Sequence, residues 1–74
     1  MNPMILVFKT SIKSMSELDN IASDMNHFLG EEATWNVDLE DCDNILRVVT
    51  DQYDDQQIEY FLLSRGYFCK ALED

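Results

Sequence analysis

Side chains that could bind a soft metal or act as nucleophiles are few in this chain. The 74 residues include two cysteines, Cys42 and Cys69, and one histidine, His27. The cysteines are too far apart in the sequence to form a short metal-binding pair. Two thiols without a disulfide framework are typical of a reducing compartment. A catalytic cysteine needs a neighbouring base, and helical spacing predicts that His27 faces solvent. We therefore expect both thiols to be ordinary side chains.

Acidic residues dominate the charge. Fifteen aspartates and glutamates stand against five lysines and arginines, which gives a formal net charge of −10. This charge disfavours nucleic acids and anionic membrane surfaces as partners. The acids gather around residues 38–43 and 51–55. We interpret them as solvated turn residues and helix-start residues. The alternatives are a hard-cation site or a docking surface for a basic partner, but the spacing of a calcium-binding loop is absent.

The sequence lacks the signatures of an enzyme. The chain has only two glycines, and both lie at predicted helix ends, so no phosphate-binding loop is expected. No nucleophile comes with a second base, and we assign no catalytic residue and no cofactor. No apolar run is long enough to span a membrane. The short apolar start has no cleavage site of a signal peptide. We therefore expect a cytoplasmic protein that does not bind membranes.

The spacing of apolar residues predicts four strands. Residues 4–12 and 45–50 are rich in β-branched and aromatic side chains, which is typical of buried strands. Residues 34–40 alternate apolar and polar side chains, the pattern of a strand with one buried face. Residues 67–72 form a last short strand. The acidic turn at 41–44 is short enough to make the second and third strands a hairpin.

Two amphipathic helices separate these strands. Apolar side chains recur at helical spacing in residues 16–29 and in residues 55–65, so each helix has one apolar face. Capping boxes and glycines mark the helix ends. These signals are Ser14 with Glu17, Asp54 with Gln57, Gly30 and Gly66.

The element order is therefore β-α-β-β-α-β, within one domain that spans residues 1–74. This order predicts the α+β class and a ferredoxin-like sandwich. Such a sandwich has a four-stranded antiparallel sheet with two helices on one face. Its strand order is 4-1-3-2. The first and third strands then occupy the centre, as their apolar composition requires.

Four segments carry a family resemblance. They are Phe8-Lys9-Thr10, Trp35-Asn36-Val37-Asp38-Leu39, Leu46-Arg47-Val48, and the stretch from Ile58 that ends in Gly66-Tyr67. Together they resemble the strands and final helix of the heavy-metal-associated domain family. That family includes small copper chaperones and the N-terminal modules of metal-transporting ATPases. The resemblance runs from Ile5 to Leu72 and implies the ferredoxin-like fold.

The metal-binding motif of that family has no counterpart here. In the family, a G-M-x-C-x-x-C loop before the first helix supplies two thiolates for ions such as Cu(I). The matching residues 11–18 contain no cysteine. Met15 and Leu18 stand at the thiolate positions, or Ser14 and Glu17 after a shift of one residue. The resemblance therefore implies the fold and not the activity, and we assign no metal site.

The sheet face that turns away from the helices is the remaining candidate site. Strand alternation places Ile5, Val7, Ile45 and Val49 on this face, with Arg47 at its centre. An apolar patch in water usually marks a contact. We therefore expect a small non-catalytic interaction module that forms a homodimer or binds a protein partner through these residues.

A heavy-metal carrier with altered ligands is the alternative interpretation. It would combine the Met15 thioether with the thiol of Cys42 or Cys69. The predicted topology separates the two cysteines by roughly 12 Å, which exceeds the reach of a disulfide. Shared ligation by both cysteines within one monomer is therefore not expected, and such a carrier would depend on Met15 or on a second copy.

Overall fold

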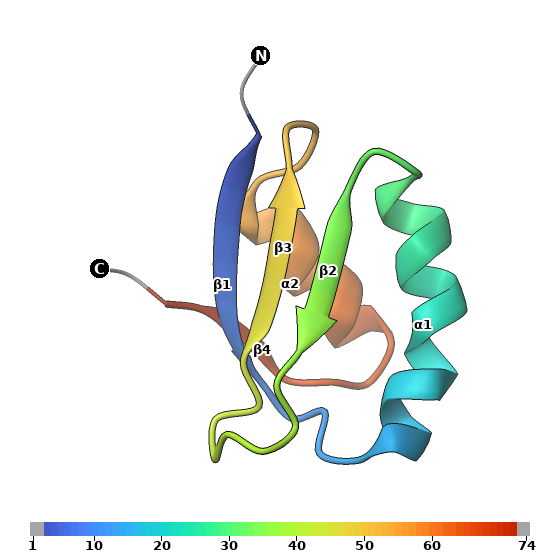
Figure 1. The fold of residues 1–74 in the computed structure, drawn as a ribbon, viewed down its shortest axis with the longest axis vertical. Coiled ribbons are helices and arrows are strands. Elements are labelled where there is room, and N and C mark those ends of the chain that lie inside the picture. The colour runs from blue at the N-terminus through green and yellow to red at the C-terminus, as the bar shows by residue number, and fades with distance from the viewer. Residues whose placement is uncertain (1–2, 73–74) are drawn as a thin grey trace.

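The computed structural model describes residues 3–72 and contains four strands and two helices. In chain order they are β1 (Met4–Thr10), α1 (Met15–Leu29), β2 (Thr34–Val37), β3 (Leu46–Thr50), α2 (Asp55–Ser64) and β4 (Cys69–Ala71). The strands form one antiparallel sheet in the order β2-β3-β1-β4, and both helices cover the same face of it (Figure 1). The predicted ferredoxin-like βαββαβ fold and its strand order are confirmed.

The strand register determines which side chains face the helices. Residues that lie directly opposite each other in an antiparallel pair share a face. Leu6 pairs with Val48, and Phe8 pairs with Leu46 and Ala71, so these side chains point the same way. Phe8, Leu46 and Val48 are fully buried. The central position of β1 and β3 follows from this burial, because only these strands are flanked by neighbours on both sides.

Each helix adds its apolar stripe to this core. The buried side chains of α1 are Ile21, Met25 and Leu29. Those of α2 are Ile58 and Leu62. Their spacing of three and four residues is the one that places side chains on a single helix face. His27 of α1 is exposed, as its position on the opposite stripe predicts.

The helix starts follow the sequence signals, with one difference. Asp54 and Gln57 form the predicted capping box, with two reciprocal hydrogen bonds of 2.9 Å. The Ser14 hydroxyl accepts the N–H of Glu17 at 3.2 Å, as predicted. The Glu17 carboxylate, however, accepts the N–H of Lys13 at 3.0 Å. It therefore reaches one residue beyond the N-cap, so the box at α1 is only half formed.

The strands are shorter than the sequence patterns predict. The strand expected at 34–40 ends at Val37, because the Asp38 carboxylate accepts the N–H of Glu40 at 3.1 Å and turns the chain. The predicted four-residue turn is thus a loop over residues 38–45. Thr10 closes β1, and β4 covers only Cys69–Ala71. Alternation predicts which side chains are buried, but ladder hydrogen bonds decide where a strand ends.

Neither helix could cross a bilayer. Within residues 3–72, no helix combines the length and the apolar composition that a membrane span requires.

Candidate functional site

The sheet surface that faces away from the helices is built from three cross-strand rows. We call its eight strand residues the open face. The rows are Ile5–Val49–Thr34, Val7–Arg47–Asn36 and Lys9–Lys70. The open face holds three of the five basic residues of the chain and none of its fifteen acids. This segregation of charge is unexpected for a chain with a net charge of −10.

Apolar surface is concentrated in one part of the open face. The Ile5 side chain is 69% exposed, whereas Val7 and Val49 are half-buried. A shallow hollow of about 240 Å³ lies between β1, β3 and β2. It is lined by Ile5, Thr34, Trp35, Asn36, Arg47 and Val49. Aliphatic and cationic side chains are therefore available next to each other for contact.

The cations of the open face differ in their partners. Lys9 Nζ lies 3.4 Å from the carboxylate of Asp43, which belongs to the loop between β2 and β3. Within residues 3–72, neither Arg47 nor Lys70 forms a salt bridge. Lys70, on the edge strand, also borders a hollow that Glu59 of α2 helps to line. The exposed guanidinium of Arg47 is thus the uncompensated charge at the centre of the sheet.

One predicted member of this surface is misplaced. Ile45 is only 8% exposed and adds no accessible apolar area to the open face. It precedes β3, and its carbonyl accepts the N–H of Asp38 at 2.8 Å. Its neighbour Asn44 has a φ of 48°, which bends the chain away from strand geometry. Ile45 therefore belongs to the loop, and extending strand alternation by one residue was wrong.

The two cysteines occupy different environments. Cys42 is exposed in the loop between β2 and β3, and Cys69 is 4% exposed at the start of β4. Burial, with a smaller contribution from the negative charge of Glu59, raises the pKa of the Cys69 thiol to about 12. Soft metals bind the thiolate. Because Cys69 stays protonated at neutral pH, it is a poor metal ligand.

The other potential metal ligands, at the start of α1 and in the loop that precedes β3, are exposed or already form hydrogen bonds or salt bridges. Met15 is exposed at the start of α1. The ligand atoms of Asp41, Cys42 and Asp43 lie within 4.8 Å of one another. Asp41 Oδ1 accepts the N–H of Asp43 at 2.8 Å, and Asp43 contacts Lys9. These local contacts account for the cluster, which is typical of an exposed acidic loop.

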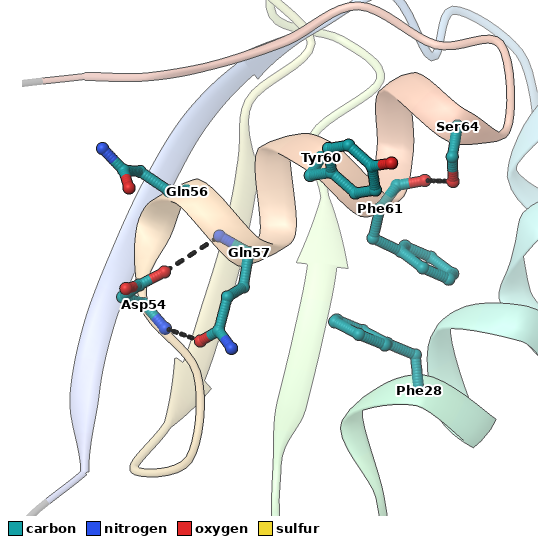
Figure 2. Close-up of a pocket in the computed structure, with 7 residues that line it drawn as sticks. All are labelled: Phe28, Asp54, Gln56, Gln57, Tyr60, Phe61 and Ser64. Atoms are coloured by element: carbon teal, nitrogen blue, oxygen red, sulfur yellow. Dashed lines mark hydrogen bonds between the residues drawn. The ribbon is translucent and has the colours of Figure 1, made fainter.

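A second feature, the helix-side cavity, was not anticipated from the sequence. This open cavity of about 590 Å³ lies between α1 and α2, on the side of the molecule away from the open face (Figure 2). It is lined by Phe28, Asp54, Gln56, Gln57, Tyr60, Phe61 and Ser64. Phe28 from α1 and Phe61 from α2 point toward one another and stack to form one wall of it, and Tyr60 is 77% exposed at its rim (Figure 2).

Comparison with known proteins identified no relative of this chain. No family model, no curated protein and no solved structure matches this chain. What the structure supports is the ferredoxin-like fold. A fold of this kind hosts unrelated functions, so the fold alone does not indicate what the chain does.

Proposed function

We propose that the chain is a small non-catalytic interaction module that binds a protein partner through the open face of its sheet. The composition of that face is the observation that carries the proposal. Its strand residues combine exposed Ile5 with three cations and include no acid, on a chain that is otherwise strongly acidic, and only Lys9 has a carboxylate partner, Asp43. Exposed apolar surface rimmed by charge is typical of protein contacts.

The charge of the open face favours a partner whose contacting surface is acidic. Carboxylates of such a partner would pair with Arg47 and Lys70, while its apolar side chains would cover Ile5. In a symmetric dimer, the same patch meets itself. Two open faces would then bring together Arg47 and Lys70 of both copies, and like charges across an interface cost binding free energy. A different, acidic protein is therefore favoured over a second copy.

We also propose that the chain is a divergent relative of the heavy-metal-associated domains that works in the cytoplasm without bound metal. The βαββαβ order and the Gly66-Tyr67 pair that follows α2 support this ancestry. The loop over residues 11–14 lacks thiols. The raised pKa of Cys69 also argues against a soft-metal role. Titration with Cu(I) under reducing conditions tests this proposal, and tight stoichiometric binding that requires Met15 would contradict it.

Site-specific photo-cross-linking tests the docking surface. Ile5 is replaced by p-benzoylphenylalanine in the full chain, which is then irradiated inside cells. The matched control places the same group at Leu63 of α2, which is 56% exposed on the helix side. We expect one defined adduct from position 5, whose cross-linked peptide is rich in aspartate and glutamate, and none of it from position 63. The same adduct from both positions, or only a cross-linked homodimer, would overturn the proposal.

A further inference from the structure

The helix-side cavity shares no residue with the open face. Its volume of about 590 Å³ falls in the range of small-molecule sites, roughly 300–1,000 Å³. Three of its seven lining residues are aromatic: Phe28, Tyr60 and Phe61. Tyr60 is 77% exposed and is not part of the hydrophobic core. An exposed aromatic side chain beside an aromatic cavity has no evident packing role and is suited to binding.

The aromatic walls present ring edges to the cavity. Phe28 stacks on Tyr53 with a centroid distance of 4.6 Å and on Phe61 with a centroid distance of 4.3 Å. The Arg65 guanidinium lies 5.2 Å from the Phe61 centroid. The faces of these two phenylalanine rings are therefore largely covered. Ring edges carry partial positive charge and attract the negative face of another aromatic ring.

The polar lining indicates an uncharged ligand. Asp54 is the only charged residue among the seven that line the cavity. Its carboxylate already accepts the N–H of Gln57 at 2.9 Å, at the positive end of α2. Arg65, which lies over the Phe61 ring, is paired with Asp24 at 3.5 Å. An anionic ligand would meet the repulsion of Asp54 and of the acidic chain. A cation would be attracted by Asp54, but the ring faces of Phe28 and Phe61 that could bind it are already covered, and the ring edges carry partial positive charge.

Hydrogen-bonding groups at the rim are neutral. Gln57 Oε1 accepts the N–H of Asp54 at 2.9 Å, and this bond fixes the amide at one end of the cavity (Figure 2). Its Nε2 group remains as a donor to a ligand. The Ser64 hydroxyl donates to the carbonyl of Phe61 at 2.6 Å and holds the opposite wall. Because the capping box and the aromatic stack are already formed, the site needs little reorganisation to bind.

We propose that the helix-side cavity binds a small uncharged aromatic compound of one or two rings. The ring lies against the edges of Phe28 and Phe61 and beneath Tyr60. A polar atom of the ligand accepts from the amide of Gln57 or bonds to the Tyr60 hydroxyl. The compound is recognised by its aromatic face and its lack of charge.

Titration of the ¹⁵N-labelled chain with indole, followed by NMR, tests this proposal. We expect saturable shifts at residues of the cavity, with a dissociation constant on the order of a millimolar or lower. Cyclohexanol, which is apolar but not aromatic, should bind about tenfold more weakly, and so should the anion indole-3-acetate. Tyr60→Ala should weaken indole binding by about fivefold. The matched control Phe68→Ala removes an exposed aromatic side chain outside the cavity and should change nothing.

The proposal is overturned by the absence of saturable shifts, by equal binding of cyclohexanol and indole, or by equal binding of indole to the wild type and to Tyr60→Ala. Gln57→Glu is the second variant, because glutamate preserves the capping box while it removes the amide donor. It should keep the helix intact and weaken indole binding. Stronger binding of indole-3-acetate than of indole would also contradict the site chemistry.

Discussion

Val7 and Arg47 lie directly opposite each other on the two central strands of the sheet. An exposed guanidinium thus occupies the middle of a surface whose neighbouring positions include the aliphatic residues Ile5 and Val49. A β-branched apolar side chain would suit this strand position better. The proposed docking function would use the arginine at this position.

Replacement of Arg47 by valine tests whether this residue serves the fold. Arg47→Val should leave the free energy of unfolding unchanged or raise it by about 0.5 kcal/mol, because a β-branched residue then pairs with Val7. Urea denaturation measures the change. The variant should also self-associate more at high concentration, since a larger apolar patch is exposed. A loss of more than about 1 kcal/mol would mean that Arg47 has a structural role.

The stack of Tyr53, Phe28 and Phe61 joins α1 to α2 and to the loop before it. Phe28→Leu removes both ring contacts while it keeps an apolar side chain. We expect a loss of about 1–2 kcal/mol in the free energy of unfolding. Phe68→Leu is the control, because Phe68 is exposed and should change stability by less than about 0.5 kcal/mol. Equal effects of the two variants would show that the stack does not stabilise the fold.

Thr10 anchors the acidic loop to the end of β1. Its buried hydroxyl donates to the carbonyl of Asn44 at 2.7 Å and accepts the N–H of Ile12 at 3.3 Å. Thr10→Val keeps the shape but leaves both backbone groups without this partner. The expected cost is about 1–3 kcal/mol, measured by thermal unfolding. Thr34→Val, on the exposed edge strand, is the matched control and should be close to neutral.

The buried thiol of Cys69 predicts a loss of stability in alkali. Its pKa rises from 9.0 to about 12 on folding, because burial disfavours the thiolate. The folded state therefore holds the proton more tightly, and the stabilisation is lost as pH rises above 9.0 toward about 12. Between these values this group contributes a slope of about −1.4 kcal/mol per pH unit.

Urea denaturation between pH 8 and 10.5 measures this contribution. Cys69→Ala should remove that part of the alkaline slope. Identical slopes in the wild type and in Cys69→Ala would contradict the assignment. Comparison with the variant is needed because tyrosines and lysines also titrate in alkali.

Much of the fold follows from sequence patterns, and the exceptions have physical causes. Helical spacing gives the buried stripe of Ile21, Met25 and Leu29, and strand alternation gives the burial of Phe8 and Val48. Both patterns predict which side chains become buried on folding. The burial of Ile45 did not follow from alternation, because hydrogen bonds within the loop decide its conformation.

The two candidate sites differ in how far the sequence predicts them. The basic character of the open face is contained in the sequence, since Lys9, Arg47 and Lys70 occupy alternate strand positions. The sequence alone does not show that these three residues share one face, because this depends on the register of the three strands. The helix-side cavity has a weaker signal. In the sequence, Phe28 and Phe61 look like ordinary core residues. The cavity beside their stack forms only when the fold brings α1 and α2 together.

The central claim is that the open face docks an acidic protein surface, and charge reversal at Arg47 tests it most directly. The measurement is the yield of the photo-cross-link formed from position 5 in cells. The account predicts that Arg47→Glu abolishes the adduct, whereas Lys13→Glu, a reversal of an exposed charge outside the open face, preserves it. An undiminished adduct in Arg47→Glu, or equal loss in both variants, would contradict the account.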